Sequence, residues 1–193
     1  MNSKGADTVR HLRLISTATA IGMAAAVTLA AQAPTGTTGT AAAPAPAATA
    51  ALIDAQGRSI GEARFQATPN GVLLKLDLKN AAPGVHAMHI HAVGKCDAPG
   101  FTSAGSHLSV GGKQHGFLNS SGPHTGDLPN IEVPSSGQLS VEQHVASLKL
   151  DSGVNSLLDA DGSALVIHAA KDDYATDPAG ASGDRIACGQ LKK

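Results

Sequence analysis

The segment GVHAMHIH occupies residues 84–91, and the rest of the chain is interpreted outward from it. Successive side chains of a β-strand point to opposite faces, so His89 and His91 share one face while His86 and Ile90 share the other. Two imidazoles on one face of a strand can bind a single metal ion. His86 lies on the apolar face, and we predict that it hydrogen-bonds backbone carbonyls instead of a metal.

Further candidate ligands follow at short intervals, because residues 85–127 contain six of the nine histidines in the chain. Chance could supply a pair, but it does not readily supply this set with an aspartate three residues after one histidine. A site of imidazoles alone suits copper, although zinc can use one, and histidines with one carboxylate suit zinc. The pattern predicts a two-metal site with seven candidate ligands: His89, His91, His107, His115, His124, Asp127 and His168.

The flanking sequence predicts an all-β domain. After the hairpin signal Asn70-Gly71, the side chains of Val72, Leu74, Leu76 and Leu78 fall on one face of a half-buried strand. Two long aperiodic segments rich in Gly, Ser and Pro are interpreted as functional loops, because the first carries most candidate ligands. Short strands separated by turns and two such loops predict an antiparallel sandwich or barrel. The other strands are predicted at 51–55, 60–67, 86–91, 139–150, 164–168 and 186–191, and the loops at 94–134 and 171–184.

The first fifty residues differ in composition from the rest. Lys4, Arg10 and Arg13 precede an apolar run without charge at residues 14–31. This arrangement is typical of a secretory signal peptide, and a retained membrane anchor is the alternative because the run is nearly long enough to span a bilayer. An uncharged Ala/Pro/Thr segment follows, too poor in large apolar groups to form a core. The predicted organisation is a signal peptide (1–33, cleavage point open), a linker (34–49) and one folded domain (50–193).

Charge and cysteine content narrow the functional classes. The formal net charge is −1 and only 2% of the residues are aromatic, so nothing indicates nucleic-acid binding. Both cysteines, Cys96 and Cys188, lie in the predicted domain. An even number in an exported chain favours a disulfide, with two buried thiols as the alternative.

Over nearly its whole length, the predicted domain resembles the copper/zinc superoxide dismutases of the bacterial exported type. Each matching segment is modest alone, and their order and spacing together with the two cysteines carry the resemblance. It implies an eight-stranded Greek-key barrel of immunoglobulin-like sandwich architecture with two long functional loops. The segments are HAMHIH (86–91), TSAGSH (102–107), KQHG (113–116), HTGDLPN (124–130), ALVIHAAKDD (164–173) and GDRIACG (183–189).

The resemblance also implies roles for individual residues. Asp172 is expected to hydrogen-bond a copper ligand and a zinc ligand, and Arg185 to attract and orient an anion beside copper. The implied reaction converts two superoxide radicals to oxygen and hydrogen peroxide by Cu(II)/Cu(I) cycling, with the bridging His107 delivering a proton. One copper and one zinc ion are implied per subunit. The expected copper ligands are His89, His91, His107 and His168, and the expected zinc ligands are His107, His115, His124 and Asp127.

Some questions stay open at the level of sequence. A carrier that binds copper or zinc without redox chemistry is the alternative function, although a carrier has no need of Arg185. Ala87 and Leu108-Ser109-Val110 depart from the family pattern, which leaves the local loop geometry and the rate open. Export to a periplasm is expected, with secretion or tethering as alternatives. After signal removal no membrane association is expected. The sequence does not decide the oligomeric state, and a homodimer is compatible with the resemblance.

Overall fold

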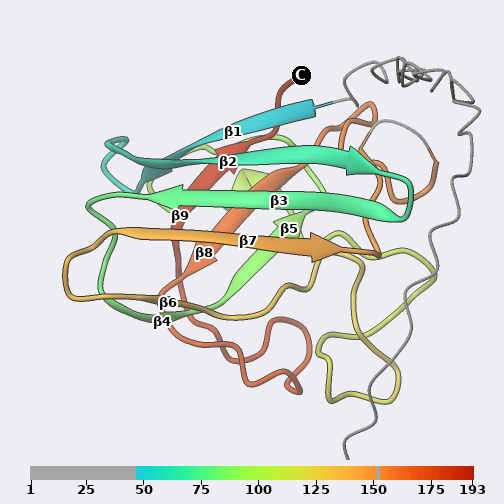
Figure 1. The fold of residues 1–193 in the computed structure, drawn as a ribbon. Coiled ribbons are helices and arrows are strands. Elements are labelled where there is room, and N and C mark those ends of the chain that lie inside the picture. The colour runs from blue at the N-terminus through green and yellow to red at the C-terminus, as the bar shows by residue number, and fades with distance from the viewer. Residues whose placement is uncertain (1–46, 151–152) are drawn as a thin grey trace, which may run out of the picture. The chain divides into compact units, whose positions relative to one another are not determined.

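The computed structural model describes residues 47–150 and 153–193, which form an all-β fold (Figure 1). The predicted signal peptide and the first part of the predicted linker lie outside the described residues. The elements are β1 (Ala47–Asp54), β2 (Ser59–Thr68), β3 (Gly71–Leu78), β4 (Gly84–His86), β5 (Met88–His91), the 3-10 turn η1 (Thr102–Ala104), β6 (Ile131–Val133), β7 (Leu139–Val145), β8 (Ala164–His168) and β9 (Arg185–Gln190).

Seven strands form one curled antiparallel sheet in the order β5-β8-β9-β1-β2-β3-β7, and β4 pairs with β6 in a second, two-stranded sheet. Only Ala87 separates β4 from β5, so the predicted strand 86–91 is one broken strand that contributes to both sheets. Counted in this way, the described residues form a barrel of eight strands. The chain crosses from β3 to β5 and again from β7 to β8, between strands that are not neighbours in the sheet. The predicted all-β Greek-key fold is confirmed.

The barrel core follows from the alternation of apolar residues. Val72, Leu74, Leu76 and Leu78 of β3 are all buried, as the sequence pattern predicts. In β1 the buried face begins earlier than predicted, with Ala48 and Ala50, so the described part of this strand includes the last residues assigned to the linker. Alanine gives little hydrophobic contrast between the two faces of a strand, which explains why the pattern missed this part of β1.

Two other predicted boundaries also differ from the structure. β7 ends at Val145, five residues before the predicted end, although Leu148 and Leu150 are still buried. These two leucines are buried although they lie outside the strand. The backbone of Lys149 hydrogen-bonds residues 155 and 157 instead of continuing the pairing of β7 with β3. The predicted loop 94–134 contains the short strand β6 at its end, where the apolar Ile131 and Val133 flank one polar residue.

A second, smaller apolar cluster lies apart from the main core. The segment that follows β5 packs Phe101 and Ala104 against Ala164 and Val166 of β8 and against Cys188 of β9. The predicted disulfide between Cys96 and Cys188 is confirmed, with Cα atoms 5.6 Å apart. Closing a loop with a sequence separation of 92 residues stabilises the fold by roughly 4–5 kcal/mol in the chain-entropy view.

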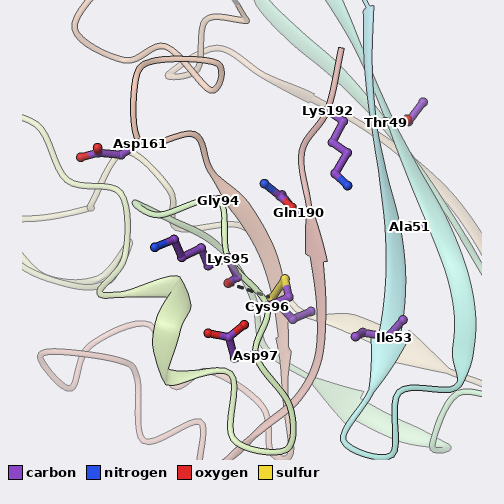
Figure 2. Close-up of a pocket in the computed structure, with 11 residues that line it drawn as sticks. Thr49, Ala51, Ile53, Gly94, Lys95, Cys96, Asp97, Asp161, Gln190 and Lys192 are labelled. Atoms are coloured by element: carbon purple, nitrogen blue, oxygen red, sulfur yellow. Dashed lines mark hydrogen bonds between the residues drawn. A yellow bond between two sulfur atoms is a disulfide. The ribbon is translucent and has the colours of Figure 1, made fainter.

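A groove of about 560 Å³ lies beside this disulfide. Figure 2 shows its walls, with Thr49, Ala51 and Ile53 of β1 on one side and Gly94 to Asp97 on the other. In the part of the chain that the structure describes, the groove lining includes the disulfide but none of the predicted metal ligands. The disulfide indicates an oxidising compartment. Among the described residues, no helix has the length and apolar character needed to cross a membrane.

Candidate metal centre

The candidate ligands converge because two loop segments pair with the outer edge of β5. The N–H of Ile90 donates to the carbonyl of Gly126 at 2.8 Å, and the N–H of Leu108 donates to the carbonyl of Ile90 at 2.8 Å. A Cβ atom at Gly126 would overlap the Ile90 carbonyl oxygen, so only glycine permits this approach. As a result His107 and Asp127, distant in sequence, lie next to the histidines of β5.

Four buried histidines form the first set, here named the four-histidine set. One ring nitrogen of each has a fixed hydrogen-bond acceptor, whereas the other is buried without a partner among the described residues. The four residues can each offer one atom within 4.8 Å of the others. The partnered atoms are His89 Nε2 with Asp172 Oδ2 (2.8 Å), His91 Nδ1 with the Gly105 carbonyl (2.9 Å), His107 Nδ1 with Asp127 Oδ1 (3.0 Å) and His168 Nδ1 with the Gly183 carbonyl (3.2 Å).

This pattern places the lone pairs of the four rings toward one another. An acceptor at one ring nitrogen holds the proton there, so the other nitrogen, His89 Nδ1 or the Nε2 of the other three, keeps its lone pair. Burial lowers the pKa of His91 to about 2, of His168 to about 3 and of His107 to about 4. These imidazoles are therefore neutral at pH 7 and ready to bind a metal ion without first losing a proton.

The second set surrounds one carboxylate oxygen. Asp127 Oδ1 lies 3.0 Å from His107 Nδ1, 3.1 Å from His115 Nδ1 and 3.4 Å from His124 Nδ1. Four ligands about 2.0–2.2 Å from a tetrahedral zinc ion are separated from each other by about 3.3–3.6 Å. The three observed distances agree with this to within a few tenths of an ångström. His124 Nδ1 is the most distant of the three from Asp127 Oδ1, and the group of four donors within 4.8 Å of one another includes His89 in its place.

Asp127 and His115 carry opposite charges within this second set. The other oxygen of Asp127, Oδ2, accepts the backbone N–H groups of Gly116 (2.9 Å) and His124 (3.0 Å). Burial raises the pKa of Asp127, but hydrogen bonds from His107 and His115 outweigh it and keep this pKa below the usual range. Burial lowers the pKa of His115, and its hydrogen bonds to Asp127 and Asp172 outweigh that effect and raise the pKa to about 9. The His115 ring therefore carries an extra proton in the absence of a metal, and a bound metal cation would take the place of that proton.

Asp172 links the two sets. Its Oδ2 lies 2.8 Å from His89 Nε2 and its Oδ1 lies 2.9 Å from His115 Nε2, so one carboxylate orients a ring in each set. Burial opposes its ionisation, but the hydrogen bonds from His115 and His89 lower its pKa. Gly180 passes so close that a Cβ there would lie 2.7 Å from His115 Nε2 and would overlap the Asp172 carboxylate.

Arg185 lies beside the four-histidine set, opposite His168 in the β8–β9 ladder. Its Nη1 donates to the Phe101 carbonyl at 2.8 Å and its Nη2 to the Gly105 carbonyl at 2.7 Å. The Gly105 carbonyl also holds the ring of His91, so the guanidinium and one histidine share an acceptor. Two of the five guanidinium N–H donors are used in these bonds, which leaves three for an anion.

The structure therefore brings together all the candidate residues, and it also shows contacts that the sequence did not predict. His86 hydrogen-bonds the carbonyls of Ala82 (3.0 Å) and His168 (2.8 Å), as expected for a structural histidine. Sequence reasoning missed the contacts that Gly180 and Asn130 make with Asp172. Asn130 ends the segment HTGDLPN, so its proximity to Asp127 in the sequence was the only signal that could have found it.

Comparison with known proteins identifies the family. Residues 59–191 match the family described as copper/zinc superoxide dismutase (SODC). The chain belongs to the copper/zinc superoxide dismutase family. It is 46% identical over 145 residues to superoxide dismutase [Cu-Zn] 1 of Aquifex aeolicus (74% of this chain and 86% of that protein). It is also 44% identical over 148 residues to the superoxide dismutase [Cu-Zn] of Caulobacter vibrioides (75% of this chain and 85% of that protein).

Solved structures agree with this family assignment. A superoxide dismutase-like protein from Bacillus subtilis superimposes with a TM-score of 0.72 at 35% identity, covering 75% of this chain and 97% of that one. The Cu/Zn superoxide dismutase from Brucella abortus gives a TM-score of 0.62 at 25% identity, covering 76% of this chain and all of that one. Copper and zinc are thus the cofactors of the family, and the two buried donor sets of this chain fit them.

Proposed function

We propose that this chain disproportionates superoxide to oxygen and hydrogen peroxide, with His89, His91, His107 and His168 as the copper ligands. The observation that carries the proposal is the set of four buried ring nitrogens without partners, next to a guanidinium that has donors to spare. A site of imidazoles without thiolate or carboxylate suits copper in both oxidation states. The adjacent cation suits a small anionic substrate.

We assign zinc to the second set, which consists of His107, His115, His124 and Asp127. Three imidazole nitrogens around one carboxylate oxygen at tetrahedral spacing support this assignment. When bound, copper supplies a one-electron redox couple, and zinc supplies a fixed positive charge without redox chemistry. His107 belongs to both sets, with Nδ1 toward Asp127 and Nε2 toward the other three histidines.

The residues of the chain then have separate tasks in the reaction. Arg185 binds and orients superoxide, because two backbone carbonyls hold its guanidinium in place and the remaining N–H groups can donate to the anion. When its Nε2 is not bound to copper, His107 would hold a proton there and give it to reduced superoxide, with the second proton taken from water, while its Nδ1 faces Asp127. Asp172 keeps the rings of His89 and His115 in the orientations that both sets require.

The alternative, a metal carrier without redox activity, accounts for the histidines but not for Arg185. Reconstitution separates the two functions. Protein loaded with copper and zinc should accelerate superoxide decay, whereas protein loaded with zinc alone should not. A protein that binds one copper per chain in the four-histidine set and leaves superoxide decay unchanged would be a carrier.

We further propose that residues 1–33 act as a secretory signal and that the mature domain functions in a periplasm. The oxidised Cys96–Cys188 pair supports an oxidising compartment. Comparing the mass of the protein recovered from the periplasm with that of the full chain tests both the export and the cleavage point.

A further inference from the structure

Asp172 is held from its backbone as well as from its side chain. The side-chain amide of Asn130 spans the peptide groups of Asp172, with Nδ2 donating to the Asp172 carbonyl at 2.9 Å and Oδ1 accepting the Asp172 N–H at 2.8 Å. These two bonds connect segments 42 residues apart in the sequence. The amide thus pairs with the backbone N–H and the carbonyl of Asp172, as the backbone of a neighbouring β-strand would, and it restrains both groups.

Tyr174 completes a closed ring of hydrogen bonds. Its hydroxyl oxygen accepts the backbone N–H of Asn130 at 2.7 Å, and its own N–H donates to Asp172 Oδ1 at 2.6 Å. The backbone of Tyr174 has a φ angle of 63°, in the left-handed region that is costly for a residue with a side chain. Its carbonyl accepts the N–H of Leu118, so the surrounding contacts hold Tyr174 in this conformation.

We infer that Asn130 and Tyr174 are positioning residues that hold the Asp172 carboxylate where its two oxygens meet His89 and His115. Among the described contacts, neither Asn130 nor Tyr174 hydrogen-bonds a histidine, so their effect on the metal sets passes through Asp172. If the carboxylate turns, both rings lose their orientation together, because each depends on a different oxygen of the same group. The inference rests on the proposed metal assignment and adds two residues to it.

The experiment measures zinc loss from copper- and zinc-loaded protein to an excess of a chelator at pH 7. Asn130→Ala removes both hydrogen bonds between its side-chain amide and the backbone of Asp172. Tyr174→Phe removes only the hydroxyl oxygen and keeps the hydrogen bond from the Tyr174 backbone N–H to Asp172 Oδ1. Changes in groups that orient metal ligands cost about 10–100-fold in metal affinity. We expect about tenfold faster zinc loss for Asn130→Ala and about threefold for Tyr174→Phe. The electron paramagnetic resonance spectrum of the bound copper should shift in both variants, because the ring of His89 turns.

Asn119→Ala is the matched control. Asn119 lies in the same loop, and its side chain contacts Gln114 and Ser121 rather than Asp172. This variant should lose zinc at the wild-type rate and keep the wild-type copper spectrum. A merely general loosening of the loop would accelerate zinc loss in Asn119→Ala as well, and that outcome would overturn the inference.

An Asp172→Ala background tests whether the effect passes through the carboxylate. There, Asn130→Ala should change the rate of zinc loss by less than about twofold, because the group that it positions is absent. A full tenfold effect in this background, or wild-type rates in both Asn130→Ala and Tyr174→Phe, would overturn the inference. These measurements need no superoxide turnover. Wild-type protein that holds both metals but does not accelerate superoxide decay would refute the proposed function alone.

Discussion

Replacing Arg185 with isoleucine removes the cation beside the four-histidine set without removing a metal ligand. The guanidinium donates to the carbonyls of Phe101 and Gly105, and three further N–H groups remain for the substrate. Hydrogen bonds to a charged group contribute about 1.5–3 kcal/mol, and each 1.4 kcal/mol corresponds to tenfold, so kcat/KM should fall by roughly 10- to 150-fold. The kcat/KM of Arg185→Lys should lie between those of the wild type and Arg185→Ile, because lysine keeps the charge but loses the planar arrangement of donors.

The assay is the decay of superoxide after a pulse, at low substrate and several salt concentrations, with copper and zinc content measured on the same samples. Arg64→Ile is the matched control. It removes the same charge from the surface of β2, where Arg64 pairs with Glu62 and Asp77, and it should retain nearly all activity. If Arg185→Ile keeps both metals and the wild-type kcat/KM, the assigned role of Arg185 is wrong. Loss of copper from this variant would show that the residue holds the site and not the substrate.

Three further predictions concern the metals and the fold. Asp127→Ala should weaken zinc binding at least about hundredfold and lower the melting temperature of the loaded protein, so unchanged zinc content would refute the assignment. Gly180→Ala should have a similar though smaller effect on zinc content, because the added methyl group would overlap the Asp172 carboxylate. In the metal-free protein, three histidines of the four-histidine set have pKa values below 6.5, so the unfolded chain binds more protons than the folded chain. The free energy of unfolding therefore decreases as the pH is lowered. His115 opposes this because its raised pKa contributes stability that is fully present below pH 6.5 and is lost toward pH 9. The net loss between pH 7 and 5.5 should be about 3 kcal/mol, measured by denaturant unfolding, and equal stability at the two pH values would contradict it.

The parts of the fold that the sequence could predict are those with strong local contrast. The alternation from Val72 to Leu78 predicts both the strand and its buried face, and the i, i+2 spacing of His89 and His91 predicts their common side. The start of β1 was missed because Ala48 and Ala50 differ too little from their neighbours in hydrophobicity. Alternating large apolar residues reveal the buried face of a strand from its own sequence. Alternating small residues do not, and their buried face can be recognised only when the neighbouring strands are known.

The relative placement of the ligands could not be read from the residues alone. Gly126 must reach the carbonyl of Ile90, and Asn130 must reach Asp172 across 42 residues, and no local pattern encodes either contact. The resemblance to a family gave the grouping of the histidines, and the geometry now supplies a physical basis for it. That basis is the partnered nitrogen on one side of each ring and the unpartnered nitrogen on the other.

The most direct test of the account is the rate of superoxide decay in the presence of the purified domain that contains one copper and one zinc per chain. We predict decay first order in enzyme, with one oxygen and one hydrogen peroxide formed for every two superoxide radicals consumed. The same protein loaded with zinc alone should leave the decay at the rate of the buffer. Copper-loaded protein with an intact four-histidine set that also leaves the decay at the buffer rate would contradict the central claim.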